Sequence, residues 1–126
     1  MPHDPRVSIL AANAQANAIG ALSARGWLRF YSEEGAELAA LRLGENAFQE
    51  AIDGRIYSNP IQPDTNAAGG NDAARFMVQT EDGQDVFGGS VGLENSNSDY
   101  EFKNSTYIHP GSEVHAAGLS YQAWHG

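Results

Sequence analysis

The sequence predicts a mainly β fold, an antiparallel β-sandwich or jelly-roll-like domain with one N-terminal α-helix. Most of the chain alternates apolar and polar residues with a period of two, which is typical of half-buried strands. The alternating stretches are short and are separated by Gly, Pro, Asn and Asp. Only one stretch has helical periodicity, so the repeated strand–helix alternation of a βαβ fold is not expected.

Length and composition limit the possible classes of protein. The 126 residues are expected to form a single domain, 1–126, that buries a core without a metal or a disulfide. The absence of cysteine excludes disulfides, thiolate zinc sites and a cysteine nucleophile. The net charge of −9 argues against binding of nucleic acid phosphates. Without a signal peptide or a long apolar run, no membrane partner is expected.

The one expected helix spans residues 8–25, after a flexible arm at residues 1–7. Ser8 can cap the helix, alanine is frequent, and Gly26 follows as a stop signal. Its apolar arc is formed by Ile9, Ala12, Ala16 and Ile19 and is widened by Ala18 and Leu22. Such an arc covers either a sheet of the same chain, which is our main expectation, or another subunit.

The strands of the expected β-sandwich lie within residues 27–124. They cover residues 27–32, 38–43, 47–58, 76–92, 100–104 and 113–124. In the first of them, Leu28 and Phe30 form a core face opposite a semi-polar aromatic face. A turn or bulge is expected at Asp53–Gly54, and Pro110–Gly111 occupies the centre of an expected type II turn.

A hairpin around Asp82–Gly83 is the expected centre of the fold. An Asp-Gly pair between two β-prone runs is the strongest short-range signal for a two-residue turn. The resulting register pairs Thr80 with Asp85, Val78 with Phe87, and Phe76 with Gly89. This register puts Phe76, Val78 and Phe87 on one face, and a slip by one residue would bury the wrong set.

Residues 59–73 form a long polar loop by composition. Loops of this length in a compact domain are usually functional or flexible. This segment and the N-terminal arm are therefore the expected contacts with neighbouring molecules.

Nothing in the sequence points to catalysis, a cofactor or a metal. Of the four histidines, His3 and His125 lie near the ends of the chain, and His109 and His115 flank a turn without an acidic residue at ligand spacing. Residues 81–85 do not meet the twelve-residue calcium pattern, and residues 88–92 only approach a nucleophile elbow. We expect no enzyme activity, and hence no catalytic, cofactor-binding or metal-binding residue.

Trp27, Tyr31 and Tyr57 fall on faces opposite the apolar alternation. Large amphipathic aromatic residues outside a core serve both protein contacts and carbohydrate platforms. The simpler alternative is a sandwich in which both sheet faces are partly covered.

Three stretches carry a resemblance to a known family. They are residues 14–22 running into 27–32, residues 38–43 with 46–48, and residues 76–92 followed by 100–108 and the Pro110–Gly111 turn. Together, in this order along most of the chain, they resemble small virion structural proteins of tailed bacteriophages. Each stretch is a helix, strand or turn pattern rather than a site. The acidic loop 32–36 departs from the longer polar insert of the family.

The resemblance implies a virion component, and a capsid decoration (cement) protein is the expected role. Such a protein is made in the host cytoplasm, binds the major capsid protein at the capsid surface and stabilises the shell. It often forms a symmetric homo-oligomer, here expected as a dimer or trimer. The alternatives are a head–tail connector or tail accessory protein, and a carbohydrate-binding module. The candidate protein contacts are Pro2, His3, Asp4, Arg6, Trp27, Tyr31, Tyr57, Ile61 and Pro63.

Overall fold

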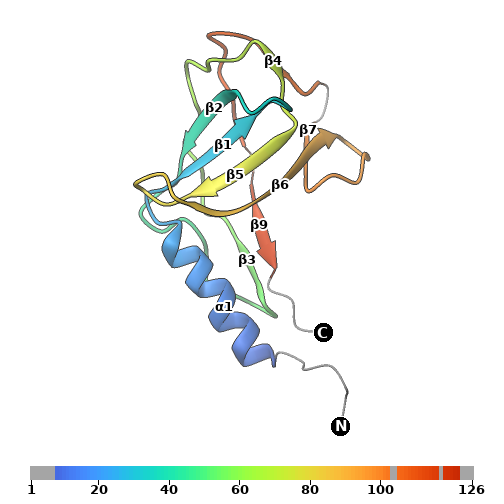
Figure 1. Cartoon of the computed structure of the whole chain (residues 1–126). Helices are drawn as coiled ribbons and strands as arrows, with labels where there is room; N and C mark the ends of the chain where they lie inside the picture. The colour runs from blue at the N-terminus through green and yellow to red at the C-terminus, as the bar shows by residue number, and fades with distance from the viewer. Residues whose placement is uncertain (1–7, 103–104, 117, 123–126) are drawn as a thin grey trace.

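The computed structural model describes residues 8–102, 105–116 and 118–122, and it places one helix and nine strands there (Figure 1). The helix is α1 (Ile9–Leu22). The strands are β1 (Trp27–Tyr31), β2 (Glu37–Arg42), β3 (Arg55–Tyr57), β4 (Asn71–Asp72), β5 (Arg75–Gln79), β6 (Asp85–Leu93), β7 (Tyr100–Phe102), β8 (Tyr107–Ile108) and β9 (Ser120–Gln122). The expected class, mainly β with one N-terminal helix, is confirmed.

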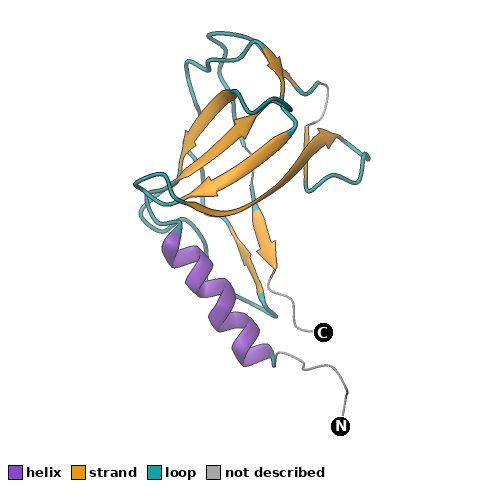
Figure 2. Ribbon diagram, in the orientation of Figure 1, coloured by secondary structure: helices purple, strands orange, loops and turns teal. Residues whose placement is uncertain are grey.

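The strands form one curled five-stranded sheet and two small sheets (Figure 2). The large sheet has the order β2-β1-β5-β6-β7, and its last pair, β6 with β7, is parallel. The small sheets join β3 to β9 and β4 to β8, both antiparallel. This mixed, curled arrangement is compatible with the expected sandwich or jelly roll without establishing either of them.

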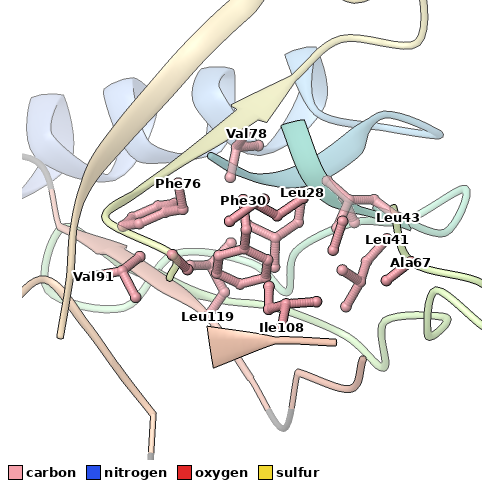
Figure 3. Packing of buried hydrophobic residues seen from close by; sticks show 14 residues of the cluster. Leu28, Phe30, Leu41, Leu43, Ala67, Phe76, Val78, Val91, Ile108 and Leu119 are labelled. Carbon is pink, nitrogen blue, oxygen red and sulfur yellow. The ribbon is translucent and has the colours of Figure 1, made fainter. Parts of the chain in front are cut away.

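The main hydrophobic core lies against one face of the large sheet (Figure 3). The sheet contributes side chains that are almost fully buried: Leu28, Phe30, Leu41, Phe76 and Val78. Ile108 and Leu119, from later segments, close this core from the other side. Phe87 packs against the same cluster, so the predicted common face of the central hairpin is confirmed.

The β5–β6 hairpin has the predicted register in its body and a different one at its tip. The body pairs Phe76 with Gly89 and Val78 with Phe87, as predicted. The predicted pairing of Thr80 with Asp85 is wrong, because the register shifts after Val78 and Asp85 pairs with Gln79. The Thr80 N–H donates to the Gln84 carbonyl at 2.8 Å, which closes a loop wider than two residues.

A tight two-residue turn is found instead at the other Asp-Gly pair, Asp53–Gly54. Both residues have a positive φ, 52° and 78°, as a type I′ turn requires. The flanking residues, Ile52 and Arg55, exchange backbone hydrogen bonds of 2.9 and 3.0 Å. The turn expected at this position is confirmed, and it forms the tip of a small hairpin beside α1.

Helix α1 begins as predicted and ends earlier than predicted. The Ser8 hydroxyl oxygen accepts a hydrogen bond from the Ala11 N–H at 3.1 Å, so Ser8 is the N-cap. The predicted extension to residue 25 is wrong, because the helix ends at Leu22. Arg25 adopts a left-handed φ of 56° and turns the chain toward β1.

Gly26 has a different role from the predicted stop signal. It is buried, and a Cβ atom placed on it would lie 1.9 Å from the carbonyl oxygen of Gln79. No side chain fits in that space, so β1 and β5 approach one another closely only because this residue is glycine.

Residues 59–70 run along the free edge of β2. Three hydrogen bonds fix them there: Gln62 N–H to Arg42 O at 3.0 Å, Ala40 N–H to Asp64 Oδ2 at 2.9 Å, and Gly69 N–H to Leu38 O at 2.9 Å. Unpaired sheet edges invite pairing with other chains, so this segment protects the edge. The predicted loop over residues 59–73 is wrong at residues 71–72, which form β4, and hydrogen bonds to β2 hold residues 59–70 in place.

The same segment also rests on the turn at residues 109–112. Gly111 has a φ of 76°, and the Ser112 N–H donates to the His109 carbonyl at 3.1 Å. The predicted type II turn is therefore confirmed. A Cβ atom on Gly69 would lie 2.5 Å from the carbonyl carbon of His109, so the two backbones touch.

Candidate interaction surfaces

Trp27 lies on the outer face of the large sheet, where its own chain contacts it. The guanidinium groups of Arg29 and Arg42 lie 4.6 and 4.4 Å from the centroid of its ring. Its indole N–H donates to the carbonyl of Glu81 at 3.3 Å. A sugar that stacked on this ring would have to compete with two cation–π contacts. Trp27 is therefore better explained as a residue that packs against its own chain on the sheet surface than as an open platform for a ligand.

Tyr31 lies on the same outer face and is partly buried. Burial raises the pKa of its phenol, and the neighbouring Glu37 carboxylate raises it further. The Gln79 amide donates to the Tyr31 hydroxyl at 3.4 Å and to Asp85 Oδ1 at 3.0 Å. Tyr31 and Arg75 line an open hollow of about 540 Å³. The Gln79 amide therefore links side chains of β1 and β6 on the outer side of the sheet.

Tyr57 lies on β3, in a different sheet from Trp27 and Tyr31. Its side chain is 52% exposed. It lines a separate hollow of about 540 Å³ with the acidic residues Asp99 and Glu101. The three aromatic residues proposed from the sequence thus do not share one sheet face.

Ile61 and Pro63 belong to the segment that runs along the β2 edge. Both are half-buried, and Ile61 packs against the main core. A contact between this segment and a partner stays a prediction. The other sequence candidates, Pro2, His3, Asp4 and Arg6, lie outside the described residues.

The inner face of α1 packs on the small hairpin that leads into β3. Ala12 and Ala16 are fully buried there against Ala51 and Ile56. Side chains of the helix also bind the hairpin backbone: Asn13 Oδ1 accepts from Gly54 N–H at 2.6 Å, and Asn17 Oδ1 accepts from Ala51 N–H at 2.9 Å. The expectation that the helix covers a sheet of its own chain is confirmed.

The outer face of α1 is apolar too, and the predicted arc was wrong in part: Ile9, Ala18 and Leu22 are exposed rather than buried against the chain. Leu10 is 82% exposed and Leu22 is 56% exposed, at the two ends of the helix. Alanines at positions 14, 18 and 21 are exposed between them. The missed signal was the absence of any charged residue in the whole helix. A surface helix normally has a charged or polar face opposite its buried stripe.

Histidines and carboxylates do not gather into a metal site in the described part of the chain. His109 and His115 line a hollow of about 570 Å³ together with Glu113. The His115 Nε2 atom lies 2.5 Å from Glu113 Oε1. His3 and His125 lie outside the described residues. In the described ranges, no helix has the length and apolar character that a membrane span requires.

Comparison with known proteins leaves the resemblance as a hypothesis about this chain. No family model, no curated protein and no solved structure matches it.

Proposed function

We propose that this chain is a structural subunit of a tailed-bacteriophage virion, a capsid decoration protein that binds the major capsid protein and stabilises the shell. The phage origin rests on the sequence resemblance along residues 14–111. The structural role rests on the surface of the molecule, and one observation carries it.

That observation is the uncharged outer face of α1. In a chain with a net charge of −9, the helix has no charged residue over its 14 positions and exposes Leu10 and Leu22. Exposed apolar surface marks interaction sites in soluble proteins, and a surface helix normally has charged residues opposite its buried stripe. The face fits a protein that works within an assembly.

Two further features fit a subunit that must stay dispersed until it binds. The β2 edge is covered by residues 59–70, which leaves no free edge there for strand pairing between chains. The negative charge disperses free copies and attracts them toward basic patches on a shell.

Co-sedimentation with capsid shells tests this role. The purified chain is mixed with shells of the major capsid protein that lack it, and the bound amount is measured against concentration. We expect saturable binding in proportion to the number of shell subunits, and shells that resist heat or chelators better when it is bound. Absence of binding would overturn the proposal.

A shortened chain identifies the contact. Removing residues 1–7 is expected to abolish binding to shells while the melting temperature stays nearly unchanged, because the N-cap of α1 and both described core clusters are retained. A large drop in melting temperature would contradict the role of this segment as a contact arm. Binding to isolated tails or necks, with none to shells, would assign the chain to the connector or tail accessory role instead.

A further inference from the structure

We infer that the hollow beside Tyr57 binds a neutral saccharide, an activity separate from the proposed role in the virion. The hollow has a volume of about 540 Å³, within the usual range of small-ligand sites. The strands β3 and β9 contribute Tyr57 and Ser120 to it, and β7 with the residues before it contributes Ser98, Asp99 and Glu101. Figure 1 shows β3 and β9 next to one another below the large sheet, and β7 at the end of that sheet.

The β3–β9 pair presents an aromatic ring beside a hydroxyl group on a fixed support. Tyr57 lies directly opposite Ser120 in the register, so their side chains share one face of this small sheet. The other face is occupied, because Ile56 is fully buried. The Gln49 N–H donates to the Tyr57 carbonyl at 2.8 Å and fixes the edge of β3 that faces away from β9. The ring is therefore held in place while 52% of the side chain stays exposed.

Tyr100 anchors the part of the hollow that carries the carboxylates. Its ring packs in the main core, 5.4 Å from the ring of Phe30. Asp99 and Glu101 are its neighbours in the chain, so the core fixes the backbone on which both carboxylates stand. The Asp99 Oδ2 atom accepts hydrogen bonds from the N–H and the hydroxyl of Ser90, at 2.9 and 3.1 Å. This contact sets the direction of the Asp99 side chain.

Both carboxylates keep acceptor positions for a ligand. Glu101 Oε1 accepts from the Asn95 N–H at 3.1 Å, and Glu101 Oε2 accepts from the Asn97 N–H at 3.0 Å. Within the described ranges, Asp99 Oδ1 has no hydrogen-bond donor. A carboxylate offers about four acceptor positions in total. Neutral donors thus orient both groups and leave lone pairs for the hydroxyl groups of a sugar.

Charges of both signs around the hollow favour an uncharged ligand. The two carboxylates repel an anion. The guanidinium of Arg55 lies 6.0 Å from the centroid of the Tyr57 ring, and its Nη1 atom lies 3.4 Å from Ser120 Oγ. A cation at the ring would therefore meet a like charge. A neutral saccharide offers donors and acceptors without net charge, and its apolar C–H face packs on an aromatic ring.

The ring of Tyr57 is more open than that of Trp27. Two guanidinium groups lie 4.6 and 4.4 Å from the centroid of Trp27. The guanidinium beside Tyr57 lies at 6.0 Å, which is the outer limit of a cation–π contact. A sugar that stacks on Tyr57 therefore displaces little. This difference places the saccharide at the small β3–β9 sheet rather than on the large sheet.

Titration of the full chain with defined oligosaccharides tests the site. NMR spectra of the labelled protein are recorded with the neutral probes maltotriose, cellotriose, mannotriose and lactose. We expect saturable shifts of the Gly118 and Ser120 amide signals with at least one probe, because both residues line the hollow. The aldonic acid of the same sugar, which carries one negative charge, is the matched anionic probe and is expected to bind more weakly. Absence of saturable shifts with every neutral probe up to about 20 mM would overturn the inference.

Two variants test whether the sugar binds in this hollow. Tyr57→Ala removes the ring and is expected to weaken binding at least about tenfold. Asp99→Asn keeps the shape and an acceptor for Ser90 but replaces one acceptor oxygen with a donor, and a similar loss is expected. Tyr107→Ala removes an exposed tyrosine from a different small sheet and should bind like the wild type. Circular dichroism checks that each variant is folded.

Three results would overturn the saccharide site. The first is unchanged sugar binding in both Tyr57→Ala and Asp99→Asn. The second is tighter binding of pentalysine than of any neutral probe, which would make the hollow a site for cations. The third is loss of co-sedimentation with shells in Tyr57→Ala, which would make the hollow a shell contact. Sugar binding by a chain that binds no shell would support the site and contradict the virion role.

Discussion

Asn13 Oδ1 accepts a hydrogen bond of 2.6 Å from the backbone N–H of Gly54, 41 residues further along the chain. Gly54 is the second residue of the type I′ turn, and its N–H is buried. The helix therefore recognises the tip of the hairpin through a polar atom, while Ala12 and Ala16 supply the apolar contact. This docking holds the outer face of α1 in position.

Removing this acceptor is expected to destabilise the protein. Asn13→Ala leaves a buried N–H without its partner, which typically costs about 1–3 kcal/mol, partly offset by the better helix propensity of alanine. Chemical denaturation measures the loss, and hydrogen exchange of the Gly54 amide should become faster. Gln15→Ala, on the exposed side of the same helix, is the control and should change stability by less than about 0.5 kcal/mol. Equal stability of Asn13→Ala and the wild type would contradict this docking.

Gly26 and Gly44 form a matched pair for testing backbone approach. A Cβ atom on Gly26 would overlap the Gln79 carbonyl oxygen, whereas a Cβ atom on Gly44 meets nothing within 4 Å. We expect Gly26→Ala to lose at least about 2 kcal/mol, because β1 and β5 must separate. Gly44→Ala should change the free energy of unfolding by less than about 0.5 kcal/mol. Similar melting temperatures for the two variants would argue against this packing.

Alkaline pH is expected to weaken the fold through Tyr100. Burial raises the pKa of its phenol above the ordinary value of 10.0, so the fold favours the neutral form. The stabilisation is complete below pH 10 and is lost as the pH rises through the higher folded pKa. Denaturation series between neutral and strongly alkaline pH should show a smaller loss in Tyr100→Phe than in the wild type. Tyr57→Phe, which removes a hydroxyl from an exposed ring, is the control.

The cation–π contact between Trp27 and Arg42 should be measurable as a coupling energy. In a double-mutant cycle with Trp27→Leu and Arg42→Gln, we expect about 0.5–1 kcal/mol of favourable coupling, the range of exposed cation–π pairs. The cycle cancels the separate contact of Arg42 with the Arg25 carbonyl, whereas Glu81, which contacts both side chains, contributes to the coupling. Arg75→Gln serves as the second partner in a control cycle, since Arg75 has no cation–π contact with Trp27. A coupling energy no larger than in that control would contradict a stabilising cation–π contact between Trp27 and Arg42.

Local patterns predicted much of the fold correctly. The Ser8 cap, the period-two strands and the Pro110–Gly111 turn all depend on interactions between residues close in sequence. The face shared by Phe76, Val78 and Phe87 followed from simple alternation.

The errors occurred where contacts distant in sequence decide the structure. Two Asp-Gly pairs carry the same local signal, and only Asp53–Gly54 has flanking residues that exchange both hydrogen bonds. Residues 59–70 have a loop composition, yet their hydrogen bonds to β2 hold them in place. Which apolar side of α1 faces its own chain depends on the position of Ala51 and Ile56, far from the helix in sequence.

The copy number of the chain in purified virions tests the proposed role most directly. Quantitative mass spectrometry gives its amount relative to the major capsid protein. A decoration lattice repeats with the shell, so the account predicts hundreds of copies per particle. A handful of copies would move the chain to the neck or tail, and its absence from virions that carry its coding sequence would contradict the account.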